Sequence, residues 1–212
     1  MYHHVKKLMY SVRVDTPNAR FGNMLLEQFG GANGELAAAM QYTIQGWNCV
    51  DDIARRDLLL DIGTEELSHL EVVGALIRMH LKCLKTDREA AEGEPLVTIA
   101  GGGGVALFDS MGNAWTANYL KVTGELDVDL RSNIAAEARA KIVYERLIDH
   151  TDDPGTIDTL QFLVEMLNLA DVRKRIDLYF KGDPNSSIQA QAHSCLTNSI
   201  ILRVPNRRGL PI

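Results

Sequence analysis

The chain has 212 residues, of which 46% are hydrophobic and 24% are charged, a balance that is typical of one globular domain with a single core. Its formal net charge is −6 at pH 7. Binding to phosphate backbones requires clustered lysine and arginine, so this acidic balance disfavours nucleic acid as a partner.

The apolar stretches and the cysteines indicate where the chain resides. Charges interrupt the apolar windows well short of the roughly 20 residues that span a bilayer, and residues 1–13 are too polar for a signal peptide. The three cysteines, Cys49, Cys83 and Cys195, are widely spaced and show no CxxC pattern that would indicate zinc or a disulfide framework. We therefore expect a cytoplasmic protein with packed or free thiols and no membrane contact.

Glycine and proline divide the first part of the chain into three predicted helices. The first helix is predicted over residues 20–29, with a capping residue before it and Pro17 at the first helical position. Two glycines follow position 29 and end the helix. Residues 33–48 contain good helix formers and no proline. Residues 51–85 carry apolar side chains mostly at three- and four-residue steps, which predicts a long third helix.

Residues 86–117 break the helical pattern, and we expect a long irregular crossover there. Four consecutive glycines, at positions 101–104, fall inside it. A phosphate-binding loop would also need a following Gly-Lys-Ser/Thr and a strand before it, so that interpretation is disfavoured.

Two further helices are predicted after the crossover. One covers residues 127–150, and the other begins at the capping pair Asp153-Pro154 and runs to about Phe180. Residues 181–212 are rich in glutamine, serine and asparagine, and we expect them to form an irregular tail. The predicted domain therefore covers residues 1–180.

The most informative motif is Glu66-x-x-His69, in the middle of the long predicted helix. Residues three apart on a helix share a face, so this carboxylate and imidazole can bind one metal centre from one side. The alternative is that both residues lie on a solvated helix surface, because a glutamate and a histidine three residues apart occur by chance in many helices. Glu35 and Glu137 strengthen the metal interpretation, because each is a lone acid among small apolar residues and needs a partner if it is buried. The alternative is an exposed glutamate, paired in the case of Glu137 with Lys141.

One glutamate on each of two helices and a Glu-x-x-His on a third are three of the four parts of the carboxylate dimetal site of ferritin-like proteins. Residues 25–42, 57–71, 114–119 and 133–137 resemble manganese catalase sequences in order and spacing, and the similarity extends to about residue 163. The resemblance implies an all-α, ferritin-like four-helix bundle with a short N-terminal helix and a long crossover loop. It also implies dismutation of hydrogen peroxide to water and dioxygen by two manganese ions, in a homo-oligomer that is generally a hexamer.

The resemblance also implies roles for individual residues. Glu35 and His69 would ligate one manganese, Glu66 would bridge both ions, and Glu137 would ligate the other. Tyr42 matches a tyrosine near the ligands, where its hydroxyl can order the carboxylates. A core tyrosine is the alternative. Ligand type does not choose between manganese and iron, so iron fits the same residues, and no catalytic base is assigned.

Asp57 and Asp61 match positions that bind calcium in some members of the family. The other ligands of that site come from a C-terminal region that has no recognisable counterpart in this sequence. We therefore leave calcium unassigned.

The second Glu-x-x-His of the family, usually preceded by arginine, is missing. Leu167 and Ala170 fall where the glutamate and the histidine belong, and neither side chain can bind metal or accept a proton. Glu165 and Asp171 are predicted to lie on other faces of the helix, and His193 lies in the tail. A frameshift or truncation after codon 163 and natural divergence both explain the departure; the frameshift requires an Arg-Glu-x-x-His in another reading frame.

Two hypotheses of function follow. The first is a dimanganese catalase that is impaired by the loss of the second motif, and the four remaining candidate ligands favour it. The second is a non-enzymatic ferritin-like protein, either structural and of the spore-coat type or metal-binding, and Leu167 and Ala170 favour it. Iron storage would use the same ligands but is less supported by the resemblance.

Overall fold

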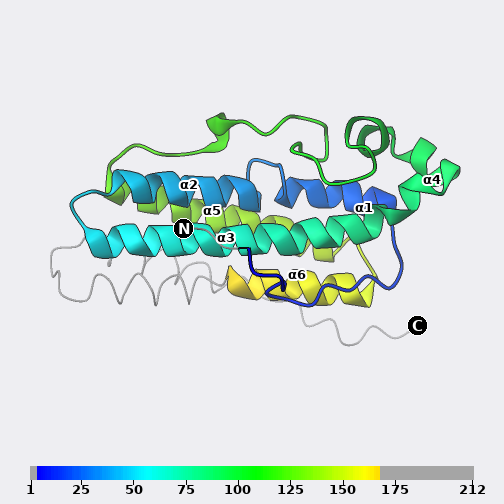
Figure 1. Ribbon diagram of the computed structural model, residues 1–212, viewed down its shortest axis with the longest axis horizontal. Helices are drawn as coiled ribbons and strands as arrows, with labels where there is room; N and C mark the ends of the chain where they lie inside the picture. The colour runs from blue at the N-terminus through cyan, green and yellow to red at the C-terminus, as the bar shows by residue number, and fades with distance from the viewer. Residues whose placement is uncertain (1–3, 168–212) are drawn as a thin grey trace, which may run out of the picture. The chain divides into compact units, whose positions relative to one another are not determined.

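Four long helices lie side by side in the computed structural model, which describes residues 4–167 (Figure 1). Helices α2 (Glu35–Asn48) and α3 (Ile53–His80) are joined by a short turn and run antiparallel, as do α5 (Leu126–Ile148) and α6 (Pro154–Met166). Within residues 4–167 there is no β-strand, so the predicted all-α four-helix bundle is confirmed. No helix in this range is long and apolar enough to cross a membrane.

The short N-terminal helix forms close to its predicted place. Helix α1 (Ala19–Met24) continues into a 3-10 turn, Leu25–Gln28. The placement of Pro17 at the first helical position is wrong, because the side chain of Asn18 accepts a hydrogen bond from the Phe21 N–H and caps the helix. Pro17 thus lies outside the helix, before its cap.

The ends of the longer helices follow local chemistry. Helix α3 tightens after His80 into a 3-10 turn, Leu81–Lys85, so the predicted long helix is present with an altered last turn. Helix α6 begins at Pro154, and the predicted cap, Asp153, accepts a hydrogen bond from the Thr156 N–H. It is helical to Met166; the predicted continuation to about Phe180 and the predicted tail lie outside the described residues.

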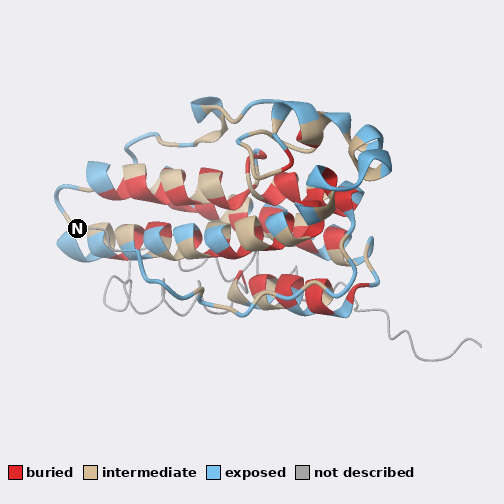
Figure 2. Cartoon of the chain, turned by 45° about the vertical axis from the view of Figure 1, so that its right-hand side comes forward, coloured by how far each residue is buried: buried red, intermediate tan, exposed pale blue. Residues whose placement is uncertain are grey.

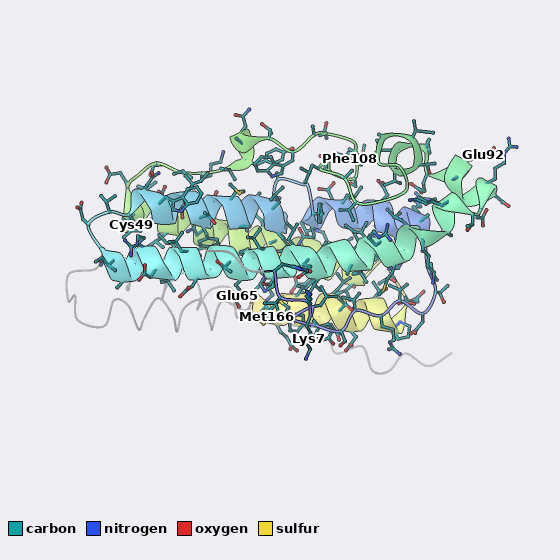
Figure 3. The ribbon with its side chains drawn as sticks, viewed as in Figure 1. Lys7, Cys49, Glu65, Glu92, Phe108 and Met166 are labelled. Carbon is teal, nitrogen blue, oxygen red and sulfur yellow. The ribbon has the colours of Figure 1, made fainter. Side chains whose placement is uncertain are left out.

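The crossover returns along the whole bundle, from the end of α3 to the start of α5 (Figure 1). It contains α4 (Arg88–Gly93), a π-helical turn (Leu96–Ala100) and a 3-10 turn (Ala117–Tyr119). Figure 3 shows Glu92 on α4 projecting beyond one end of the bundle and Phe108 in the returning segment.

The four glycines form a tight turn within this crossover. The N–H groups of Gly101, Gly103 and Gly104 donate hydrogen bonds to backbone carbonyl oxygens of the same turn. Gly102 and Gly103 have φ angles of 61° and 69°, a left-handed conformation that glycine adopts without strain. These N–H groups are therefore occupied, which agrees with the rejection of a phosphate loop.

Apolar side chains fill the end of the bundle next to α1, and buried residues line the inward faces of the helices (Figure 2). The fully buried members include Leu25, Leu26, Leu76, Ile77 and Leu160. Burying a leucine or isoleucine stabilises the fold by about 1.5–3 kcal/mol, so this core fixes how the helices pack.

A network of polar side chains lies toward the opposite end of the bundle. The side chain of Asn133 accepts a hydrogen bond from Gln41 at 2.8 Å and donates one to Gln45 at 2.6 Å. Gln45 also donates to the carbonyl oxygen of Lys121, whose N–H donates to Gln41. The network joins α2, α5 and the end of the crossover.

The N-terminal segment is fastened to α6. One carboxylate oxygen of Asp153 accepts hydrogen bonds from the backbone N–H groups of Asp15 and Thr16, at 2.8 and 2.6 Å. Further along α6, the ring of Tyr10 stacks on Phe162 with a centroid distance of 4.2 Å. The last helix of the described chain is thus held at two points by its beginning.

Cys49 and Cys83 are free and partly buried, and Cys195 lies outside the described residues. Cys49 follows α2 at one end of the bundle (Figure 3), and Cys83 follows α3 at the other. A helix of 28 residues separates them. The length of that helix rules out a disulfide bond between the two.

Candidate metal centre

Glu35, Glu66 and His69 lie together in the middle of the bundle. One ligand atom from each lies within 4.8 Å of the others. The Nδ1 atom of His69 is 3.0 Å from a carboxylate oxygen of Glu66 and 3.7 Å from one of Glu35. All three side chains are buried. Two helices therefore direct two carboxylates and an imidazole at one point.

Gly63 lets α2 and α3 approach closely one turn before Glu66. A Cβ atom at position 63 would lie 2.6 Å from the hydroxyl oxygen of Thr43 and 3.2 Å from the carbonyl oxygen of Ala39. A side chain there would crowd Thr43 and the backbone of α2. The short interhelical distance brings the first residue of α2, Glu35, within reach of Glu66 and His69.

Glu137 is buried on α5 and lines the same cavity as Glu35 and Glu66. It accepts a hydrogen bond of 2.6 Å from the hydroxyl of Tyr42, so this tyrosine contacts a candidate ligand rather than the apolar core alone. The structure thus brings all five residues of the predicted site into one region.

Tyr144 was not predicted as part of the site. It is fully buried on α5, and its hydroxyl donates a hydrogen bond to Glu35. Burial and the neighbouring carboxylates, Glu137 for Tyr42 and Glu35 for Tyr144, raise the pKa of both tyrosines well above its usual value, so both phenols stay protonated donors. The signal in the sequence is a tyrosine seven positions after each lone glutamate, Glu35 and Glu137.

Burial makes the carboxylates costly to ionise without a cation. It raises the pKa of Glu66 well above the usual value and that of Glu137 to about 7. Burial acts in the same direction on Glu35, but hydrogen bonds and charge from His69 outweigh it and lower the pKa. Desolvation would lower the pKa of His69, yet its hydrogen bonds to Glu35 and Glu66 raise it to about 11. A divalent cation would replace these protons and neutralise the group.

The cavity between these residues is small and has an approach from outside. Its volume is about 20 Å³, room for a molecule the size of water, and Leu167 lines it together with Glu35 and Glu137. A larger polar hollow of about 520 Å³ adjoins it. Asn33 and Arg139, joined by a 2.8 Å hydrogen bond, line both spaces. A small polar molecule can therefore approach the carboxylates past this pair.

Leu167 and Ala170 stand where the family has its second glutamate and histidine, and of these two positions the structure describes Leu167. It is buried, at 2% exposure, at the end of α6, so an apolar side chain occupies the wall where the resemblance places a glutamate. Figure 3 shows the preceding residue, Met166, at the end of α6 beside α3. Glu165 is exposed, as expected for another face of the helix. Ala170, Asp171 and His193 lie outside the described residues.

Asp57 and Asp61 are exposed on α3, and Asp57 accepts hydrogen bonds from the guanidinium of Arg56. Within residues 4–167, neither aspartate belongs to a group of three or more side chains that could hold a metal ion. Calcium stays unassigned.

The whole described region matches one protein family. Residues 1–168 match the family described as "Manganese containing catalase". The chain belongs to the manganese catalase family. Among its relatives is a "Probable manganese catalase" of Clostridium acetobutylicum, 43% identical over 166 residues that cover 77% of this chain and 73% of the relative. Another is "Protein CotJC" of Bacillus subtilis, 40% identical over 78% of this chain and 86% of the relative.

A solved member of the manganese catalase family has the same fold. The crystal structure of KatB, described as a manganese catalase from Anabaena, is 38% identical and superposes with a TM-score of 0.73, covering 100% of this chain and 87% of KatB. The family implies manganese as the metal. The donor set fits that ion, because carboxylates and imidazole suit manganese and the buried carboxylates need a cation.

Proposed function

We propose that this chain dismutates two molecules of hydrogen peroxide to two waters and one dioxygen at a centre for two manganese ions, and that its turnover is reduced. One peroxide is oxidised to dioxygen while the other is reduced to water, so no further oxidant or reductant is needed. The observation that carries the proposal is the meeting of Glu35, Glu66 and His69 in a buried cavity within a manganese catalase fold.

In this proposal, side chains of the chain bind the two metal ions. Glu35 and His69 would hold one ion, Glu137 would hold the second, and Glu66 would serve both. When bound, the manganese pair supplies the two-electron redox change. The small cavity and the larger hollow beside Asn33 that adjoins it support an approach for a small polar substrate such as peroxide. Iron would fit the same donors.

Leu167 accounts for the reduced turnover. The second ion has Glu66 and Glu137 from the described chain, while Leu167 offers neither a ligand atom nor a group that accepts a proton. Judged from residues 4–167 alone, the second ion would therefore have fewer side-chain ligands than the first, and Leu167 would offer it no group for proton transfer.

The test is the manganese content per chain of the purified full-length protein, with oxygen release from peroxide followed on the same sample. We expect one tightly and one weakly bound manganese, and oxygen release faster than that of free Mn²⁺ at equal concentration. A chain fully loaded with manganese that releases oxygen no faster than the free ion would refute the proposal.

A second candidate function is a non-enzymatic ferritin-like protein, and buried Leu167 in the cavity wall favours it. It predicts a stable bundle whose manganese content does not change peroxide decay. The same experiment therefore separates the two candidates. Cytoplasmic location and assembly into a hexamer are further parts of the proposal; size-exclusion chromatography with light scattering tests the latter.

A further inference from the structure

Two tyrosines repeat one spacing on different helices. Tyr42 follows Glu35 by seven residues on α2, and Tyr144 follows Glu137 by seven residues on α5. Seven residues are about two turns, so in each helix the glutamate and the tyrosine lie on the same face. Both faces are turned inward, because all four side chains are buried.

The hydrogen bonds of these pairs are crossed. The hydroxyl of Tyr42 donates to Glu137, and the hydroxyl of Tyr144 donates to Glu35. Helices α2 and α5 run in opposite directions, so equal spacings place each tyrosine opposite the glutamate of the other helix (Figure 1). The arrangement thus has an approximate two-fold relation between the two halves of the bundle.

The bond from Tyr144 selects one orientation of Glu35. It uses the Oε1 atom of this carboxylate, and the Oε2 atom lies 3.7 Å from Nδ1 of His69. One oxygen is thereby held by α5 and the other is presented to the Glu66 and His69 side of the cavity. A tyrosine that only filled the core would satisfy its hydroxyl with any nearby acceptor and would not need to repeat this geometry.

We propose that Tyr144 is a positioning residue for Glu35 and sets the affinity of the ion held by Glu35, Glu66 and His69, while Tyr42 serves the Glu137 side. The inference rests on the proposed manganese centre and extends it. Within the described part of the chain, Leu167 leaves the Glu137 side with fewer ligands, so we expect the ion on the Glu35 side to be the tighter one. Loss of the Tyr144 hydroxyl therefore weakens the tighter ion, and loss of the Tyr42 hydroxyl weakens the other.

The experiment titrates Mn²⁺ into the metal-free full chain and measures free ion by electron paramagnetic resonance. Tyr144→Phe, Tyr42→Phe and Tyr10→Phe are compared with the natural chain; Tyr10 loses a hydrogen bond to Asp158 far from the cavity and serves as the matched control. We expect Tyr144→Phe to weaken the tighter ion at least about tenfold, with an altered signal of the bound ion, and the other two variants to leave it within about threefold.

Each outcome is informative. An unchanged affinity in Tyr144→Phe, or equal losses in Tyr144→Phe and Tyr42→Phe, would overturn the inference. If the natural chain binds no manganese, the proposed function fails first, and the two failures are thus distinguishable. Should Tyr144→Phe not fold, 4-fluorophenylalanine at position 144 fills the space of the hydroxyl but cannot donate its hydrogen bond to Glu35; an affinity equal to that of the natural chain would then refute the positioning role.

Discussion

The Nδ1 atom of His69 lies 3.0 Å from a carboxylate oxygen of Glu66, one helical turn earlier on α3. Glu66→Gln keeps the shape of this side chain and removes its charge. We expect manganese content to fall by at least about tenfold, because a neutral amide is a poorer ligand and leaves His69 without its nearest anion. Metal analysis after dialysis measures the loss.

The matched control for this prediction is Glu71→Gln on the same helix. Glu71 is exposed and contacts His4. Its substitution should leave manganese content unchanged. Equal metal content in both variants would exclude Glu66 from the site.

Leu167→Glu should return a carboxylate to the cavity wall. The metal-free variant should be less stable by a few kcal/mol, since an unpaired acid becomes buried. Binding of the weaker manganese should tighten at least about tenfold, equivalent to about 1.4 kcal/mol, and oxygen release should rise. Leu167→Gln, of the same size but uncharged, is the control. A glutamate that behaves like the glutamine would show that position 167 does not face the second ion.

His80 gives the protein a pH-dependent stability that is separate from the metal centre. Burial lowers its pKa to about 4 from the usual 6.5. Its Nδ1 accepts a hydrogen bond from the Asn18 N–H, so Nε2 carries the proton and faces the Thr156 hydroxyl. Protonation of Nδ1 would break the first bond.

The sign of the effect follows from the lowered pKa of His80. Between pH 6.5 and about pH 4 the unfolded chain binds a proton that the folded chain does not. The free energy of unfolding should therefore decrease as the pH falls through this range, by up to about 3 kcal/mol. Urea unfolding of His80→Gln should show a smaller decrease than that of the natural chain, although the variant is less stable at pH 7. Equal decreases would assign the pH dependence to other groups.

Asp153→Asn tests the attachment of the N-terminal segment to α6. The carboxylate accepts hydrogen bonds from backbone groups of Asp15, Thr16 and Thr156, and an amide presents donors to some of them instead. We expect a loss of about 2 kcal/mol in the free energy of unfolding, measured with urea at pH 7. Asp152→Asn, at the exposed neighbouring position, should cost less than about 0.5 kcal/mol.

The parts of the structure that depend on local sequence were predicted best. Helix α6 begins at the predicted Asp153-Pro154 pair, and Glu66 and His69 meet because three-residue spacing on one helix brings them together. The start of α1 was placed too early, because Asn18 caps the helix and Pro17 precedes that cap.

Contacts between distant helices were harder to predict. The role of Tyr144 depends on the register of α5 against α2, which is set by packing across the bundle and has no local signature. The same holds for the amide network around Asn133, whose partners on α2 lie 88 and 92 positions away. Glu35 and Glu137 were candidates because each is a lone acid in an alanine-rich helix, but their roles as ligands came from the family resemblance, because such an acid does not reveal its partner.

The attachment of Tyr10 and Asp15 to α6 does not depend on the residues from position 167 onward. These contacts reach Asp153 and Phe162, all before position 167, so the helix is docked by residues that precede the second half of the metal centre. The sequence from position 167 onward can change without removing that docking. The packing of α6 and the ligands that the resemblance places from position 167 onward are therefore set by different parts of the chain.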